Sequence, residues 1–203
     1  MCVRQAFALL GLMTLIVTVG AFIAFSRSSK NLTVNDVSHN YQVSEYSMKF
    51  SLISPVFIEG GLIPSRYTCD GENISVPLHI EGVPEGTKAL VLVMDDPDIP
   101  DSAKQSLGVE TVDHYVVYNI PPETVDIDEG KVVGVHGKNV RGDTTYIGPC
   151  PPDREHRYFF RLYAVKDMLS FETIPTLHEV EDVAKKTMLG MATLMGRYER
   201  IKN

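Results

Sequence analysis

Aspartate and histidine side chains, which can bind or transfer protons, stand where apolar, strand-like runs begin or end. Asp96 and Asp98 follow the run LVLVM, His114 precedes YVVYNI, and His156 precedes RYFFRLYAV. Because the ends of neighbouring strands lie along one edge of a sheet, we expect these carboxylates and imidazoles to meet there. A carboxylate beside an imidazole serves acid–base catalysis or holds a polar ligand. A single histidine at a strand end is more often satisfied by local hydrogen bonds, so both interpretations stay open here.

The sequence lacks the standard enzyme signatures. It has no Gly-x-Ser-x-Gly elbow, no His-Glu-x-x-His, no P-loop and no Gly-x-Gly-x-x-Gly. The stretch DDPDIPD, residues 95 to 101, begins like a calcium loop but lacks the glycine and the final glutamate that such a loop needs, so we predict no metal site. Cys150 is the one cysteine near these histidines in the sequence. We therefore predict a non-enzymatic protein without a cofactor.

The chain has three cysteines, Cys2, Cys69 and Cys150, and no Cys-x-x-Cys motif. This count excludes a zinc site of the cysteine type. Cys69 and Cys150 either form a disulfide or remain two buried free thiols. A bridge would close a loop of about 80 residues, worth roughly 4 to 5 kcal/mol in the chain-entropy model.

Composition and charge narrow the class of protein and of partner. The 203 residues are 44% hydrophobic and 22% charged, as in one ordinary globular domain. All 26 acidic residues follow Lys30, whereas only 16 of the 19 basic residues do. Such an acidic domain offers no broad basic surface, so we predict no nucleic-acid binding, although a local pocket can still be positive.

Residues 6 to 25, AFALLGLMTLIVTVGAFIAF, form an uncharged and mostly apolar run. Twenty helical residues span roughly the 30 Å hydrocarbon layer of a bilayer. We predict that residues 1–28 are a membrane anchor or a signal peptide and that the polar residues 29–45 are a linker. The domain, residues 46–203, would then face outside the cytoplasm, either anchored or secreted or periplasmic if residues 1–26 are cleaved.

The pattern after Ser47 is rich in β-strand signals. Short runs of β-branched and aromatic residues, separated by Gly- and Pro-containing segments, predict a mostly antiparallel sheet: MKFSLIS, KALVLVMD, HYVVYNI and RYFFRLYAV. KALVLVMD is apolar at nearly every position, which is typical of a central strand buried on both faces. Apolar residues at spacings of three and four from Leu177 to Tyr198 predict a C-terminal helix with core-filling methionines. Thr176 and Glu179 form a capping box at its start.

Four segments resemble, in order, the motifs of the phosphatidylethanolamine-binding protein family in its bacterial and archaeal Raf-kinase-inhibitor-like branch: SPVFIEGGLIPSRYTCDGENISVPLHIEGVPEGTKALVLVMDDPDIP, DHYVVYNIPPE, YIGPCPP and HRYFFRLYA. The likeness runs from about Ser54 to Arg200. It implies a mainly β fold with a large antiparallel central sheet, a second small sheet and short helices.

The resemblance also implies a small surface cavity that binds anions such as the phosphate of a phospholipid head group. Matched position by position, the ligand-binding residues are Asp96, Asp98, Pro100, His114, Tyr146, Gly148, Pro152, His156 and Tyr158. A phosphate presents acceptor oxygens, so we expect donors from the imidazoles, from the phenols and from the backbone around the glycine.

Two departures from the family pattern bear on the wall of this cavity. Val112 stands where the family often has tryptophan, and Tyr115 replaces part of that aromatic wall. Arg154 and Glu155 stand in place of a small, glycine-containing stretch. Arg154 either strengthens anion binding or pairs with Glu155.

The leading hypothesis is a non-enzymatic binding protein for a small anionic ligand or a phospholipid head group, with a membrane contact through the N-terminal segment. The alternative is an inhibitor of a protease or a kinase that acts through the surface around the cavity, as the family's names suggest. A third hypothesis is an enzyme that uses Asp96 with one histidine as an acid–base pair. The oligomeric state has no signal in the sequence.

Overall fold

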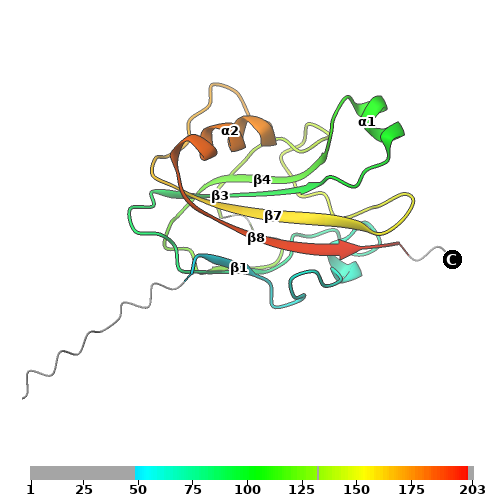
Figure 1. Cartoon of the computed structure of the whole chain (residues 1–203), viewed down its shortest axis with the longest axis horizontal. Coiled ribbons are helices and arrows are strands. Elements are labelled where there is room, and N and C mark those ends of the chain that lie inside the picture. The colour runs from blue at the N-terminus through cyan, green and yellow to red at the C-terminus, as the bar shows by residue number, and fades with distance from the viewer. Residues whose placement is uncertain (1–48, 132, 201–203) are drawn as a thin grey trace, which may run out of the picture. The chain divides into compact units, whose positions relative to one another are not determined.

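A computed structural model describes residues 49–131 and 133–200. The fold is mainly β and contains two antiparallel sheets (Figure 1). The small sheet consists, in order, of β1 (Ser51–Ile53), β2 (Leu78–Glu81) and β5 (Asp126–Ile127). The large sheet consists, in order, of β6 (Val135–His136), β4 (Val112–Ile120), β3 (Ala89–Asp96), β7 (His156–Val165) and β8 (Met188–Tyr198). The helices are η2 (Ser65–Tyr67, a 3₁₀ turn), α1 (Asp101–Leu107) and α2 (Leu177–Thr187).

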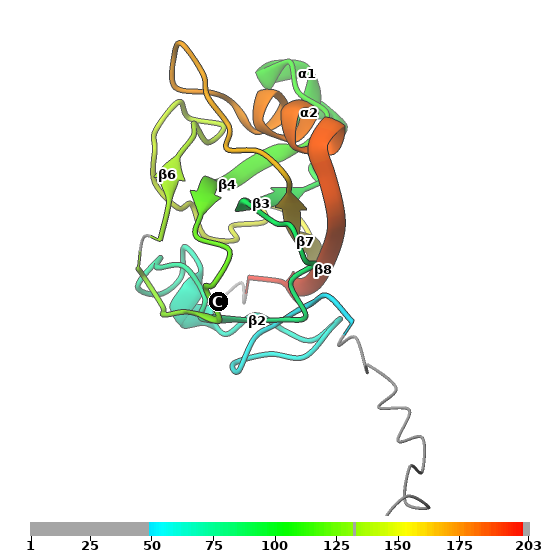
Figure 2. The same cartoon turned by 90° about the vertical axis from the view of Figure 1, so that its left-hand side faces the viewer.

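The central strand β3 is buried along its whole length, as its apolar run predicts. Side chains on one face of β3, such as Leu92, pack into a cluster shared with the small sheet. Side chains on the other face, such as Val91, pack against α2. Figure 2 shows α2 on one side of the large sheet and β2 on the other. Each of these buried aliphatic side chains stabilises the fold by roughly 1.5 to 3 kcal/mol.

The predicted C-terminal helix is half wrong. Its first part is α2, and the capping box is confirmed, because the side chains and backbone N–H groups of Thr176 and Glu179 bond reciprocally. From Met188 to Tyr198 the chain is instead β8, the edge strand beside β7. In β8 the buried positions alternate from Ala192 to Tyr198, which is the two-residue period of a strand.

The methionines of this segment do not all fill the core. Met188 and Met191 are exposed to solvent, at 43% and 49%. Gly190 and Gly196 disfavour a helix. A Cβ on Gly196 would lie 2.6 Å from the Ile63 side chain, so the close packing of β8 requires glycine there. The apolar spacing from Leu177 to Tyr198 therefore comes from a short helix followed by a strand, and not from one long helix.

The predicted anchor or signal peptide and most of the predicted linker lie outside the described residues. Between residues 49 and 200, as far as the structure describes them, no helix is long and apolar enough to cross a membrane.

A disulfide joins Cys69 to Cys150, so the alternative of two free thiols is excluded. The bridge ties the loop after η2 to the segment that leads into β7. The backbone reinforces the same contact, because the N–H of Cys69 donates to the carbonyl of Pro149 over 3.1 Å. The two segments are 81 residues apart in the sequence. One wall of the candidate site described below is therefore fixed covalently.

Reduction of this disulfide is expected to lower the free energy of unfolding by roughly 4 kcal/mol, because an open loop of this length gains entropy in the unfolded chain. Urea unfolding with and without reductant measures the difference, and the variant with Cys69→Ala and Cys150→Ala is the control that reductant must leave unchanged. Alkylation of the denatured, unreduced protein at Cys69 or Cys150 would contradict the bridge.

Candidate ligand-binding cavity

A cavity of about 190 Å³ is lined by residues at the end of the large sheet and by residues at the start of α1. Figure 1 shows α1 beside that end of the sheet. The cavity wall is also formed by the end of β3, the start of β4, the start of β7 and the segment from Val140 to Pro152. Six of the residues predicted from the sequence line it: Asp96, Pro100, His114, Gly148, Pro152 and His156. Much of the remaining wall is aliphatic, from Ile99, Ala103, Val112, Val140 and Ile147.

A β-bulge places His114 in the wall. The pairing of β3 with β4 steps from Met94–Tyr115 to Asp95–Asp113, which leaves His114 as the extra residue. A bulge of this kind turns a side chain away from the regular alternation of the strand. The His114 ring packs edge-on against the Tyr158 ring of β7, with centroids 5.2 Å apart.

The hydrogen bond of Nδ1 fixes the tautomer of His114. Nδ1 lies 2.7 Å from the carbonyl oxygen of Ile147, and a carbonyl only accepts, so Nδ1 carries the hydrogen. Burial lowers the pKa of His114, which favours the neutral ring. In the neutral ring Nε2 then carries a lone pair. This buried atom has no hydrogen-bond partner within the described part of the chain.

Asp96 and His156 form a buried pair. Oδ2 of Asp96 accepts from Nδ1 of His156 over 2.7 Å, and Oδ1 accepts from the backbone N–H of Asp98 over 2.8 Å. The other nitrogen of His156, Nε2, lies 2.8 Å from a carboxylate oxygen of Asp153. The hydrogen bond from His156 lowers the pKa of Asp153. Both ring nitrogens of His156 thus already face carboxylates, so the free donor expected from this residue is not available in this arrangement.

The wall contains a cation that the sequence did not single out. Arg141 lines the cavity and is exposed. Its backbone N–H donates to Asn139, but its guanidinium has no ion pair or hydrogen bond with any described residue. Its position depends on how the loop between β6 and β7 folds back, and no local sequence signal indicates that.

Arg154 does not pair with Glu155, so that prediction is wrong. The guanidinium of Arg154 lies 3.3 Å from an Asp153 oxygen and donates to the carbonyl of Asp98 over 2.9 Å. Glu155 instead pairs with Arg197 of β8 over 2.8 Å. Arg154 therefore contributes to the ordering of the loop that holds Asp153.

Two predicted site residues lie outside the cavity wall and support it. The Asp98 carboxylate accepts two hydrogen bonds from the Arg157 guanidinium, each of 2.7 Å, and a third from the Arg157 backbone. It thereby clamps the loop after β3 onto the start of β7. Tyr158 is fully buried against His114, and burial raises the pKa of its phenol.

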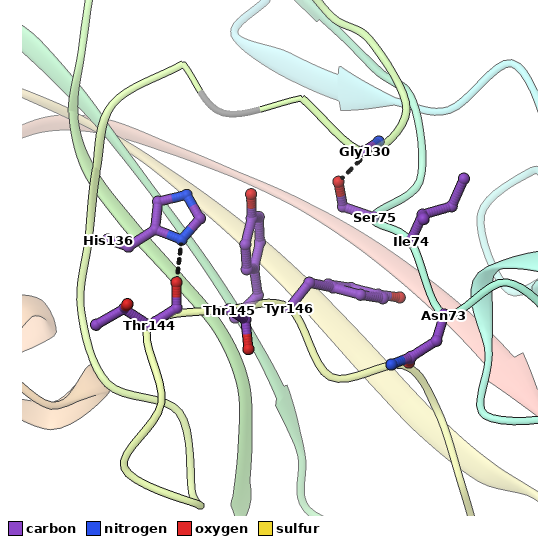
Figure 3. A pocket seen from close by; sticks show the side chains of 9 residues that line it. Asn73, Ile74, Ser75, Gly130, His136, Thr144, Thr145 and Tyr146 are labelled. Carbon is purple, nitrogen blue, oxygen red and sulfur yellow. Dashed lines mark hydrogen bonds between the residues drawn. The ribbon is translucent and has the colours of Figure 1, made fainter.

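Tyr146 faces a different hollow, of about 420 Å³ (Figure 3). Its hydroxyl donates to the carbonyl of Tyr67 over 2.9 Å, so it is not a donor for the smaller cavity. The neighbouring backbone N–H of Gly148 donates to Oδ1 of Asn73 over 2.7 Å and is likewise committed. A Cβ on Gly148 would lie 2.7 Å from the Tyr67 carbonyl, which explains why glycine stands here.

Comparison with known proteins assigns the family. The sequence profile of the phosphatidylethanolamine-binding proteins matches residues 53–199. The chain belongs to this family. A UPF0098 protein of Methanothermobacter thermautotrophicus is 42% identical over 74% of this chain and 99% of its own length. A UPF0098 protein of Chlamydia pneumoniae is 38% identical over 73% and 98%.

Solved structures of phosphatidylethanolamine-binding proteins share the fold. A homologue from Chlamydia trachomatis is 37% identical, with a TM-score of 0.70 over 75% of this chain and 98% of its own. YbcL of E. coli, described as a member of the mammalian family, is 25% identical, with a TM-score of 0.66 over 75% and 99%. The resemblance of the motifs is thereby confirmed at the level of family and fold.

Asp98 is predicted to stabilise the domain without binding ligand. The hydrogen bonds from Arg157 lower the pKa of Asp98 from 3.8 to about 2. Its contribution is therefore complete above pH 4 and lost as the pH falls towards 2. Asp98→Asn should lower the free energy of unfolding at neutral pH by roughly 1 to 2 kcal/mol, allowing for solvent screening.

Denaturant unfolding between pH 2 and pH 7 measures this effect. The difference between the wild type and Asp98→Asn should shrink as the pH falls below 4. Asp167→Asn, at an exposed position, is the matched control and should change the curve little. A constant difference across this pH range would contradict the ion-pair account.

Proposed function

We propose that this chain is a binding protein whose 190 Å³ cavity takes a small oxyanion of the phosphate type, free or as part of a head group. The observation that carries the proposal is that one cavity is lined by a buried imidazole nitrogen, on His114, and by the guanidinium of Arg141, both without a partner among the described residues. A buried polar atom without a partner costs roughly 1 to 3 kcal/mol, so a ligand that supplies the partner recovers that cost.

The size and rigidity of the cavity support a small ligand. The volume holds a phosphate with a short substituent, and the walls are held by the disulfide and by prolines on either side of it. A wall that is already ordered loses little entropy on binding. One charge-assisted contact through Arg141 and one buried hydrogen bond support dissociation constants of roughly micromolar to millimolar.

The nature of the lining residues supports binding over chemistry. Cys150 is the cysteine among the lining residues, and its sulfur is held in the bond to Cys69, so no thiol is available as a nucleophile there. The names of the two related solved structures place them among phosphatidylethanolamine-binding proteins, which agrees with a head-group or phosphate ligand. The alternative role as a protease or kinase inhibitor stays a prediction, because no contact described above favours it.

We also propose that the domain works outside the cytoplasm. The disulfide supports an oxidising compartment, and the apolar run of residues 6 to 25 supports export or anchoring. Contact with a membrane through that run belongs to the same proposal.

Phosphate should bind at His114 and Arg141. In an NMR titration at pH 6.5, the ring signals of His114 should move with saturation, whereas those of His79, which is paired with Asp126 in the small sheet, should not. Arg141→Gln should weaken binding roughly fivefold, because an exposed cation contributes about 1 kcal/mol.

Lys166→Gln is the matched control for the charge change, since Lys166 is exposed beyond the far end of β7. It should leave phosphate affinity unchanged. If His114 signals stay still at millimolar phosphate, the proposed function is wrong.

Asp153 should compete with the ligand. Its carboxylate lies where an anion would accept a hydrogen bond from Nε2 of His156. Asp153→Asn removes this internal anion and should tighten phosphate binding roughly threefold to tenfold, as the loss of one nearby like charge predicts. Calorimetry measures the change, with Asp167→Asn as the control. Equal or weaker binding by Asp153→Asn would show that the loop contact supports the wall instead.

A further inference from the structure

We infer that the cavity selects oxyanions that carry a hydrogen, such as hydrogen phosphate and phosphate monoesters, over phosphate diesters and sulfate. This inference rests on the proposed function and names its ligand class. It follows from which atoms of the wall accept hydrogen bonds and which donate them.

The buried end of the cavity presents acceptors. With Nδ1–H committed to the Ile147 carbonyl, Nε2 of the neutral His114 ring offers only a lone pair. Asp96 adds a carboxylate, which also only accepts. Two of the expected donors are committed elsewhere, since the backbone N–H of Gly148 goes to Asn73 and the Tyr146 hydroxyl to Tyr67. A third, the Tyr158 hydroxyl, belongs to a residue outside the cavity wall.

The charged and titratable groups around His114 come from each element packed against it. Asp96 lies at the end of β3, His156 and Tyr158 lie on β7, and Arg141 lies on the loop after β6. Asp113 precedes His114 on β4, and burial raises the pKa of its carboxyl to about 6. The Tyr158 hydroxyl has no hydrogen-bond partner among the described residues, but Tyr158 does not line the cavity. Among the residues that line it, Arg141 is the group whose donors are free, and it is exposed. A ligand therefore needs lone pairs for Arg141 and a hydrogen for His114.

The protonation chemistry of phosphates separates the candidates. A phosphate monoester has a second pKa of about 6, so its monoanion carries a P–OH group near neutral pH. A diester, such as the phosphate of phosphatidylethanolamine, has no such hydrogen, and sulfate has none at neutral pH. Either would place an oxygen lone pair against the lone pair of Nε2, and the buried atom would remain unsatisfied at a cost of roughly tenfold or more in affinity.

This arrangement couples binding to one proton. In the complex this hydrogen can lie on the ligand or on the His114 ring, and the number of protons taken up on binding is the same in both cases. Above the pKa values of both groups, binding of the monoester takes up one proton, so its affinity should fall about tenfold per pH unit. The monoester can be a soluble molecule or the head group of a lipid such as phosphatidic acid. The shared chemistry is the ionised monoester.

Calorimetry with methyl phosphate, dimethyl phosphate and sulfate tests the inference on the full chain. At pH 7 methyl phosphate should bind at least roughly tenfold more tightly than the other two. Heats measured in two buffers of different ionisation enthalpy should show uptake of a proton at pH 8. Sedimentation with vesicles that contain phosphatidic acid or phosphatidylethanolamine separates a lipid source from a soluble one.

His114→Gln places an amide donor near the position of Nε2 and should remove the preference, so that dimethyl phosphate and sulfate approach methyl phosphate in affinity. Proton uptake by the wild type keeps the test valid if this variant fails to fold. Equal affinity for methyl phosphate and dimethyl phosphate, without proton uptake, would overturn the inference and leave the proposed function standing. If none of the three anions binds, the proposed function itself fails.

Discussion

The buried hydrogen bond between Asp96 and His156 is the contact on which the cavity depends. The two side chains are almost completely shielded from water, and their atoms approach to 2.7 Å. Because transfer of a carboxylate out of water costs several kcal/mol, Asp96 persists there only with its full set of partners, which includes the backbone of Asp98. The bond joins the end of β3 to the start of β7, and these strands are neighbours in the large sheet. The strand ends therefore cannot separate without leaving a buried charge unpaired.

The second half of the site is a segment with no secondary structure of its own, held at several points. The disulfide of Cys150 and the bond from Gly148 to Asn73 attach it to the loop after η2, and the bond from His114 to Ile147 attaches it to β4. The two hydrogen bonds each consume a donor that a ligand would otherwise use. The same contacts that make the cavity rigid therefore make its buried end an acceptor, and this links the stability of the wall to the choice of ligand.

The fold and much of the site can be predicted from the sequence, because their signals lie in short, contiguous stretches of the chain. The apolar run of β3 identifies a doubly buried strand, and the motifs place Asp96, His114 and His156 at strand ends. The C-terminal strand was missed because apolar residues of β8 continue the spacing of α2 by coincidence. Arg141 was missed because its place depends on the fold of a long loop. The committed hydrogen bonds of Tyr146 and Gly148 involve residues about 75 positions away, which no local pattern reveals.

The protonation state of His114 connects these observations, since the tautomer set by Ile147 decides what the cavity can bind. Nitrogen-15 NMR of the His114 ring reports that state directly. At pH 7 without ligand, the account predicts a protonated Nδ1 and an unprotonated Nε2, and the Nε2 signal should move towards the protonated range when methyl phosphate binds. A ring that is protonated on Nε2 in the free protein, or an Nε2 signal that the ligand leaves unchanged, would contradict the account.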